Sequence, residues 1–292
     1  MRDLAVNGDV YMKTGLIMEG GAMRGMFTCG VIDVLMENGI SFDGAGGISA
    51  GAVFGCNIKS RQIGRPIRYN KAYCRDKRYK SLRSLITTGD LYGVDFCYRE
   101  LPDELDVFDR KAFRENPMEF FVGATDVETG SIVYHRCENG EEADMQWMRA
   151  SASMPLASRV VEIDGYKLLD GGIIDPTPYF YMKELGYDRM LVILTQPEGY
   201  RKQKSAALPL MRLALRKYPK LVEAMEKRPD RYNAHIKAIR ADEEAGKCMV
   251  IRPPEPLPLR RTENDPDKLE RTYQIGRTEA KRSLEKIRSF LV

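Results

Sequence analysis

Hydrophobic positions near the start of the chain follow a strand, helix, strand pattern. Residues 15–18 form a short apolar run that predicts a strand, and apolar residues between 31 and 36 recur at helical spacing until Asn38-Gly39 ends the helix. Residues 40–43 predict a second strand, and residues 52–58 predict a buried helix. When a crossover helix joins two parallel strands, the loops that follow both strands lie at one edge of the sheet. The pattern predicts an α/β fold in which these two loops are neighbours.

Apolar runs further along the chain predict the rest of a sheet. Strands are predicted at 119–125, 131–135, 160–163, 166–169, 189–195 and 248–251. Residues 101–113 have no regular pattern and predict irregular structure, whereas 208–215, 221–225 and 267–291 have helical spacing. We expect a continuous α/β core over residues 15–199 and a mostly helical C-terminal region over residues 200–292 that packs on this core.

Composition narrows the class of protein. The 292 residues carry a net charge of +4 from 46 basic and 42 acidic side chains, which does not favour a nucleic-acid partner. Six cysteines without paired spacing indicate neither a zinc site nor a disulfide framework. No apolar stretch reaches the roughly 18 residues of a membrane span, and residues 1–15 lack the apolar run of a signal peptide. We therefore expect a cytoplasmic protein, whose oligomeric state the sequence does not indicate.

The pentapeptide Gly47-Ile48-Ser49-Ala50-Gly51 lies where a strand is expected to give way to a helix. Glycines at both ends allow a sharp bend and close packing of strand and helix, which would raise the Ser49 hydroxyl at the end of the sheet. This is the G-x-S-x-G pattern of a nucleophile elbow. The alternative is a glycine-rich turn in which Ser49 caps the next helix.

The first strand ends in a glycine-rich loop, Glu19-Gly20-Gly21-Ala22-Met23-Arg24-Gly25. Backbone amides at the start of a helix can stabilise a phosphate or a developing oxyanion. Ala22 breaks the dinucleotide-binding spacing, and no Lys-Ser or Lys-Thr follows to make a phosphate-binding loop. The pattern therefore favours an oxyanion hole.

A serine nucleophile needs a base, and the chain has only two histidines. His135 lies on a predicted hairpin strand, and His235 lies in a charged helical stretch that indicates a surface residue. The order Ser49, Asp170, His235 matches an α/β-hydrolase, although the residues before Ser49 leave room for a single crossover. In the other interpretation Asp170, which ends a strand before Gly171-Gly172, acts on Ser49 directly.

Four motifs in order resemble the patatin-like phospholipase family, and in particular its bacterial members: residues 19–25, 47–51, 149–155 and 170–172. The likeness covers about residues 15–196. It implies a three-layer α/β/α patatin-like fold with a mostly parallel central sheet. It also implies hydrolysis of lipid acyl esters by a serine-aspartate dyad without histidine, metal or cofactor.

The resemblance assigns roles to individual residues. Ser49 falls on the nucleophile and Asp170 on the general base, and Ala22 stands where the family commonly has a glycine. The Ala22 amide is expected to serve if its φ is negative, and burial is expected to raise the pKa of Asp170. The remaining motif positions are the oxyanion loop, Gly20, Gly21, Ala22, Met23, Arg24 and Gly25, and the flanking glycines Gly47, Gly51, Gly171 and Gly172.

The function expected from these residues is a serine acyl hydrolase of the phospholipase A or lipid esterase type, with a lipid or acyl ester as substrate. A lipid-binding protein with little turnover and an acyltransferase are the alternatives. Residues 59–83 are basic and carry interspersed tyrosines. This segment would contact anionic lipid headgroups, form a lid, or be a solvated face. In the first case the protein would be peripheral on the inner membrane surface.

Overall fold

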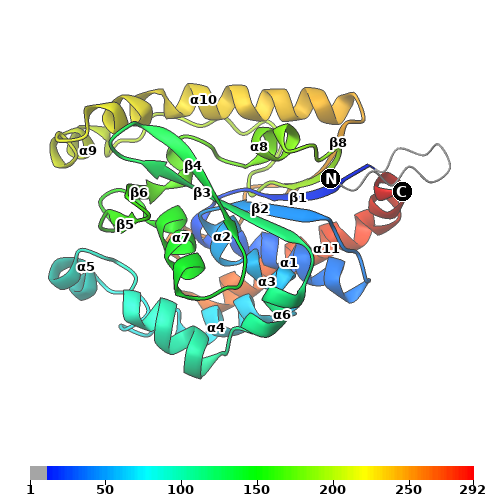
Figure 1. Ribbon diagram of the computed structural model, residues 1–292, viewed down its shortest axis with the longest axis horizontal. Helices are drawn as coiled ribbons and strands as arrows, with labels where there is room; N and C mark the ends of the chain where they lie inside the picture. Colours follow the sequence, from blue (N-terminus) through cyan, green and yellow to red (C-terminus); the bar gives the residue numbers. More distant parts are fainter. Residues whose placement is uncertain (1–11) are drawn as a thin grey trace.

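A computed structural model describes residues 12–292. Residues 1–11 lie outside the described residues. They make up most of the segment 1–15, for which the sequence predicts no signal peptide. One sheet of eight strands has the order β5-β6-β3-β2-β1-β7-β8, and β4 pairs with β3 (Figure 1). The strands are β1 (Thr14–Met18), β2 (Gly44–Ile48), β3 (Glu119–Asp126), β4 (Ser131–Cys137), β5 (Val161–Ile163), β6 (Tyr166–Asp170), β7 (Arg189–Ile193) and β8 (Cys248–Ile251).

The central part of the sheet is parallel, as expected. The pairs β3-β2, β2-β1, β1-β7 and β7-β8 are parallel, whereas β4, β6 and β5 add antiparallel pairs at the β3 side. Along β1, Leu16 and Met18 belong to the core on one face of the sheet and Ile17 to the core on the other. Successive side chains of a strand point to opposite faces, so both faces of this strand are buried.

Helices cover both faces and make the three layers (Figure 1). One face carries α8 (Tyr179–Glu184) and α10 (Pro219–Glu244), and the other carries α1 (Gly25–Glu37), α2 (Ala50–Val53), α7 (Glu142–Ala152) and α11 (Pro266–Leu291). Shorter elements are η1 (Ala22–Arg24), α3 (Cys56–Lys59), α4 (Arg65–Tyr73), α5 (Leu82–Thr88), η2 (Phe96–Leu105), α6 (Arg110–Glu115), η3 (Gly171–Ile173) and α9 (Leu208–Ala214). The predicted α/β/α class is confirmed.

Two local predictions are wrong. The second strand occupies Gly44–Ile48 instead of residues 40–43. A Cβ on Gly44 would lie 2.1 Å from the Tyr187 hydroxyl oxygen, and one on Gly47 would lie 2.1 Å from the Gly51 carbonyl oxygen. This central strand needs small residues, which give no apolar signal. Residues 101–113, predicted to be irregular, contribute instead to η2 and α6. The prediction failed because Pro102 and several acidic residues conceal the helical spacing of this segment.

Residues after 200 contribute to the same layers as the rest of the chain. The strand β8 extends the sheet beside β7, and residues 221–225 belong to the 26-residue helix α10. The final helix α11 crosses α1 at two glycines: a Cβ on Gly30 would lie 2.1 Å from the Tyr273 carbonyl oxygen, and one on Gly276 would lie 2.1 Å from that of Phe27. The two helices are therefore in backbone contact.

Among residues 12–292, every helix is too short or too polar to cross a bilayer.

Replacing Gly276 by alanine tests this helix crossing. Gly→Ala in a helix interior ordinarily stabilises by about 1 kcal/mol, but here the added methyl meets backbone that cannot move aside. We expect Gly276→Ala to lower the free energy of unfolding by about 1–3 kcal/mol, measured by urea denaturation. Thr278→Ala on the exposed side of α11 is the control and should change it by less than about 0.5 kcal/mol. Equal stability of the two variants would contradict the crossing.

Candidate active site

Ser49 lies on the turn between β2 and α2. Its φ is +55°, a left-handed conformation that a non-glycine residue rarely adopts. The Ser49 amide donates a hydrogen bond to Ser151 Oγ at 2.9 Å, and the Ser151 hydroxyl donates to the Gly123 carbonyl at 2.6 Å. Helix α7 thereby holds the turn against β3. The Ser49 side chain forms no cap hydrogen bond with α2, so the capping alternative does not describe this turn.

Asp170 ends β6 and faces Ser49. The Ser49 hydroxyl donates to Asp170 Oδ2 at 2.6 Å, and the Gly172 amide donates to Asp170 Oδ1 at 2.8 Å. The side chain is buried, and this burial raises the pKa of Asp170, while the guanidinium of Arg228 and the hydrogen bonds oppose the rise. A Cβ on Gly171 would lie 2.2 Å from the Gly123 carbonyl oxygen, so only glycine fits there.

The register of the sheet brings these two residues together. Ile48 pairs with Gly123 in the parallel β2-β3 ladder, and Asp170 pairs with Ala124 in the antiparallel β3-β6 ladder. Ser49 follows Ile48, so both residues lie beside consecutive positions of β3. Ser49 follows β2 and Asp170 ends β6, and these two strands run in opposite directions and end beside neighbouring residues of β3.

Most amides of the glycine loop are already hydrogen-bonded. Five donate to backbone carbonyls, namely those of Glu19, Gly20, Met23, Arg24 and Gly25. Among residues 12–292, the amides of Gly21 and Ala22 have no acceptor. The condition of a negative φ at Ala22 is not met, because its φ is +49°, but its amide is still without an acceptor among residues 12–292. A left-handed alanine is strained, because its Cβ crowds the following carbonyl oxygen.

Two cavities meet at Ser49. One cavity has mostly apolar and aromatic walls, which include Phe54, Tyr69, Leu101 and Phe108. A second cavity is lined by Asp170 and by several cations. Ser49 and Ala22 lie on both linings, so the hydroxyl and a free amide stand at the junction.

Comparison with known proteins identifies the family. A family model described as patatin-like phospholipase matches residues 16–182, more than half of the chain. The chain belongs to the patatin-like phospholipase family. A second model, described as a domain of unknown function, DUF6363, matches residues 218–292.

Relatives of this patatin-like chain are distant in sequence. Lysophospholipase nte1 of Aspergillus oryzae is 27% identical over 95% of this chain and 18% of its own length. An uncharacterized NTE family protein of Mycobacterium bovis is 28% identical over 60% of this chain and 47% of its own length. The chain thus spans less than half of these curated relatives. The crystal structure of VipD from Legionella pneumophila aligns with 95% of this chain and 67% of that chain, at a TM-score of 0.49 and 14% identity.

Neither histidine of this patatin-like chain lies at the Ser49–Asp170 pair within the described part of the chain. His135 bonds Asp144 Oδ1 at 2.9 Å and stacks on Trp147. His235 bonds the Thr177 hydroxyl at 2.7 Å, and burial lowers the pKa of His235 to about 4. The interpretation of His235 as a surface residue was wrong, because only 9% of its side chain is exposed.

One group of side chains has the atoms of a metal site. The ligand atoms of His135, Cys137 and Asp144 lie within 4.8 Å of one another. However, Asp144 already accepts from His135 and from the amides of three consecutive residues, 138–140. Burial also raises the pKa of Cys137, which opposes formation of a thiolate. The group fits a structural role as a bridge between β4 and α7.

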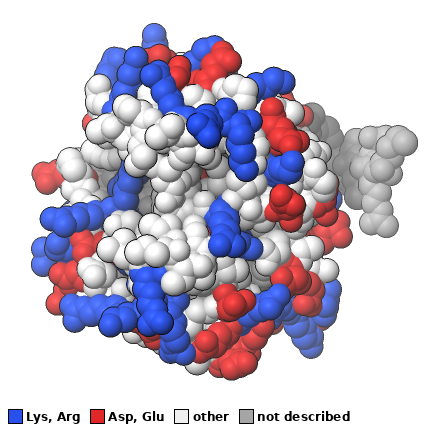
Figure 2. Space-filling model, turned by 90° about the vertical axis from the view of Figure 1, so that its left-hand side faces the viewer, with Lys and Arg blue, Asp and Glu red and all other residues white. Residues whose placement is uncertain are grey.

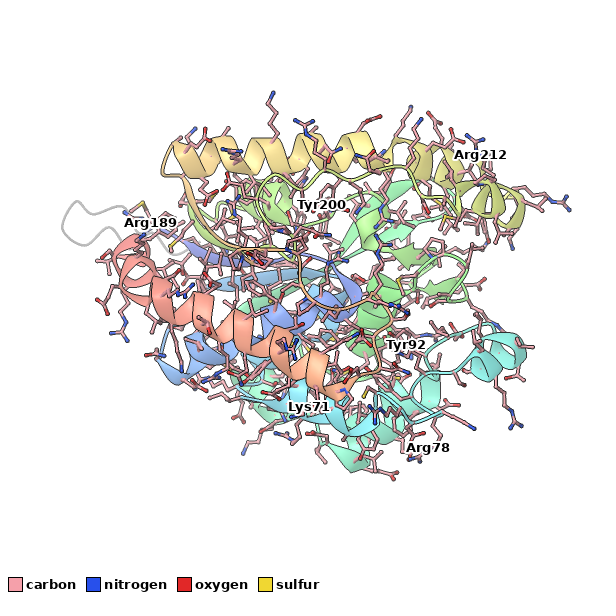
Figure 3. The ribbon with its side chains drawn as sticks, turned by 180° about the vertical axis from the view of Figure 1, so that it is seen from behind. Lys71, Arg78, Tyr92, Arg189, Tyr200 and Arg212 are labelled. Carbon is pink, nitrogen blue, oxygen red and sulfur yellow. The ribbon has the colours of Figure 1, made fainter. Side chains whose placement is uncertain are left out.

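Many cations of the basic segment 59–83 bind within the protein. Arg68 pairs with Asp106, Lys71 with Glu270 on α11, and Arg78 with Asp76 and Glu100. Figure 3 shows Lys71 below α11 and Arg78 at the lower edge of the molecule. Lys59, Arg65 and Lys80 donate to backbone carbonyls. These contacts make α4 and its flanking turns part of the wall of the apolar cavity, to which Arg65 and Tyr69 belong.

Sequence reasoning missed the cationic wall of the second cavity. Lys202, Arg228 and Arg261 are far apart in the chain and lie outside the four motifs. No local pattern distinguishes them from other basic residues. Ser151, which accepts a hydrogen bond from the Ser49 amide, lies in the motif 149–155. This motif is the sequence signal from which its place near Ser49 could have been predicted.

Proposed function

We propose that this chain is a serine acyl hydrolase that cleaves carboxylic ester bonds of lipids through Ser49 and Asp170. The observation that carries the proposal is the 2.6 Å hydrogen bond from the Ser49 hydroxyl to a buried carboxylate at the junction of two cavities. A hydroxyl becomes a useful nucleophile when a base accepts its proton. Membership of the patatin-like phospholipase family supports lipid ester hydrolysis in general.

In the proposed mechanism, Ser49 Oγ attacks the ester carbonyl carbon and its proton passes to Asp170. The tetrahedral oxyanion lies against the amides of Gly21 and Ala22, which have no other acceptor among residues 12–292. When the carbon–oxygen bond of the alcohol breaks, Asp170 returns the proton to the leaving oxygen and an acyl-serine remains. Water then attacks the acyl-serine, again with Asp170 as base, and releases the fatty acid.

The two cavities suit different parts of the proposed substrate, its acyl chain and its alcohol. The apolar cavity has room and lining for an acyl chain, whose burial contributes about 0.8 kcal/mol per methylene. The cationic cavity lies on the side of Asp170, where the leaving alcohol must receive its proton. A lipid with one acyl chain and a polar alcohol therefore fits both cavities at once.

Substitutions in the dyad test the proposal directly. Ser49→Ala and Asp170→Asn should lower kcat on p-nitrophenyl butyrate by at least about 1,000-fold, because each removes a participant in proton transfer. Ser49→Ala should also lose labelling by a fluorophosphonate. His235→Gln, which keeps a partner for Thr177, is the control and should retain activity. Loss of activity in that variant, or labelling of Ser49→Ala, would contradict the dyad.

The pH profile tests the role of Asp170. The base must be ionised, and burial raises its pKa above the usual value of about 3.9. The acidic limb of kcat/KM should therefore lie above pH ~3.9. Arg228→Gln removes a positive charge that favours the carboxylate and should move this limb to higher pH, whereas Arg228→Lys should move it less. An unshifted limb in Arg228→Gln would contradict the assignment.

The raised pKa of Asp170 also makes the stability of the folded protein depend on pH. The folded state binds the Asp170 proton more tightly than the unfolded chain does. Ionisation of Asp170 therefore opposes folding, and its cost increases from about pH 3.9 up to the folded pKa.

We also propose that the protein binds lipid surfaces through α5 and α9. Leu82 and Ile86 on α5 and Leu210 and Leu213 on α9 are each more than half exposed. Both helices lie on one side of the molecule, and Figure 2 shows Lys and Arg side chains around an uncharged area on this side. The helices border the cavity entrances, because Met211 on α9 lines the cationic cavity and Asp90, just after α5, lines the apolar one. Exposed cations nearby include Arg83 of the basic segment, Arg216 and Lys217.

Vesicle binding tests this surface. The double variant Leu82→Ser, Ile86→Ser should bind vesicles rich in phosphatidylglycerol at least about tenfold more weakly than wild type in sedimentation, because two apolar side chains no longer enter the bilayer. Leu185→Ser, at the end of α8, removes an exposed leucine outside this surface and serves as the control. Equal binding of both variants would contradict the proposed surface.

A further inference from the structure

The cationic cavity beside Ser49 has an unusual charge. Four cations line it, namely Arg24, Lys202, Arg228 and Arg261, and Asp170 is the one carboxylate of its lining. Only Arg24 lies within residues 16–182, which match the patatin-like model. Lys202 follows the last strand of the core, Arg228 lies on α10, and Arg261 lies on the loop before α11. The C-terminal region thus supplies three of the four cations.

Three of these cations, Arg24, Lys202 and Arg228, are partly buried, whereas Arg261 is exposed. None of the four forms an ion pair with a carboxylate within residues 12–292. Arg24 Nε is buried without a hydrogen-bond partner, and the Lys202 ammonium lies 4.2 Å from the centre of the Tyr232 ring. Arg228 Nε donates to the Gly172 carbonyl at 2.6 Å, which leaves the other guanidinium nitrogens free to bind a ligand. Burying a charge without a direct ion pair is costly, so the three partly buried cations indicate a site for an anion.

Electrostatics within the cluster agree with an anion site. Burial, and after it mainly the charge of Arg228, lowers the pKa of Lys202 to about 7, while the Glu19 carboxylate opposes this shift. Burial also lowers the pKa of Arg24 and of Arg228. Burial thus opposes the charged forms of Arg24, Lys202 and Arg228, and an anion placed among them would favour these forms.

The C-terminal region is fixed to the glycine loop, so the cations keep their place relative to Ser49. The Tyr232 hydroxyl on α10 donates to Glu19 Oε1 at 2.7 Å, and the Glu19 carboxylate also accepts the Thr195 hydroxyl at 2.9 Å. The Met23 amide donates to the Arg261 carbonyl at 3.2 Å. Figure 3 shows Tyr200, whose ring contacts that of Tyr232, between α10 and the sheet. These contacts tie both α10 and the loop before α11 to the first residues after β1.

We propose that the C-terminal region completes the active site by binding the phosphate of a phosphate-bearing acyl ester. A phosphate accepts several charge-assisted hydrogen bonds, and guanidinium groups match its geometry. Ser49 and Asp170 line the same cavity as the four cations, so a phosphate bound there would belong to an ester that reaches the dyad. This inference rests on the proposed acyl hydrolase function. It assigns substrate selection to the part of the chain that the DUF6363 model matches, together with Lys202.

The test compares two esters with the same acyl chain in the full-length protein. Oleoyl lysophosphatidylglycerol carries the phosphate, and monooleoylglycerol lacks it. The measured quantity is the ratio of their kcat/KM values within one preparation, so partial loss of folded protein cancels. Wild type should prefer the phosphate ester, and Lys202→Met and Arg261→Gln should each reduce this preference at least about tenfold. Lys204→Met removes an exposed charge from the same loop and is the control, with a ratio equal to that of wild type.

Each outcome decides between the possibilities. A wild type without preference, or an unchanged ratio in both variants, would overturn the phosphate assignment. Failure to hydrolyse either ester would instead overturn the proposed function. In that case calorimetry on Ser49→Ala decides the anion site, because glycerol 3-phosphate should bind to it and should bind at least about tenfold more weakly once Lys202→Met is added. If inorganic phosphate binds as tightly as glycerol 3-phosphate, the site takes a free phosphate, and the lipid headgroup assignment is overturned.

Discussion

A hydrogen bond between two buried side chains, Ser49 and Asp170, constrains the centre of this molecule. The partners are 121 positions apart in the sequence, and their oxygens are 2.6 Å apart. Strand β3 fixes this distance, because β2 pairs with its first half in parallel and β6 pairs with its end in antiparallel. A slip of either ladder by one residue would turn every side chain of that strand to the other face and separate the two oxygens.

Close backbone packing follows from this constraint. The elbow and the strand β2 before it lie in the middle of the sheet. Helices pack on one face of this region, and Tyr187 and Pro178 pack on the other face, against β2. Gly44, Gly47 and Gly171 allow this approach because each has another atom within 2.2 Å of where a Cβ would be. The strained φ values of Ser49 and Ala22 are tolerated in the same region because the surrounding packing and hydrogen bonds determine the backbone there.

The cavities on either side of the hydroxyl differ in the physical basis of their affinity. The walls of the apolar cavity come from η2, α4, α7 and the elbow helix, and the hydrophobic effect would favour an apolar group there. The cationic cavity draws most of its charge from residues after 200. In the C-terminal region, β8 pairs with β7, α11 packs on α1 and α10 packs on the opposite face of the sheet, so this region and the residues before 200 share one structure.

The sequence by itself determined the elements whose signal is local. The apolar runs located β1, β3, β4 and β7, the glycine motifs located the turns at Ser49 and Asp170, and their resemblance to a family indicated the three layers. Only the tertiary structure decided the strand at 44–48, the free amides of Gly21 and Ala22, the burial of His235 and the cationic cavity. The reason is physical. A strand whose residues must be glycine because neighbouring atoms leave no room for side chains carries no hydrophobic pattern. The charges of Arg24, Lys202, Arg228 and Arg261 come close to one another only after the chain has folded.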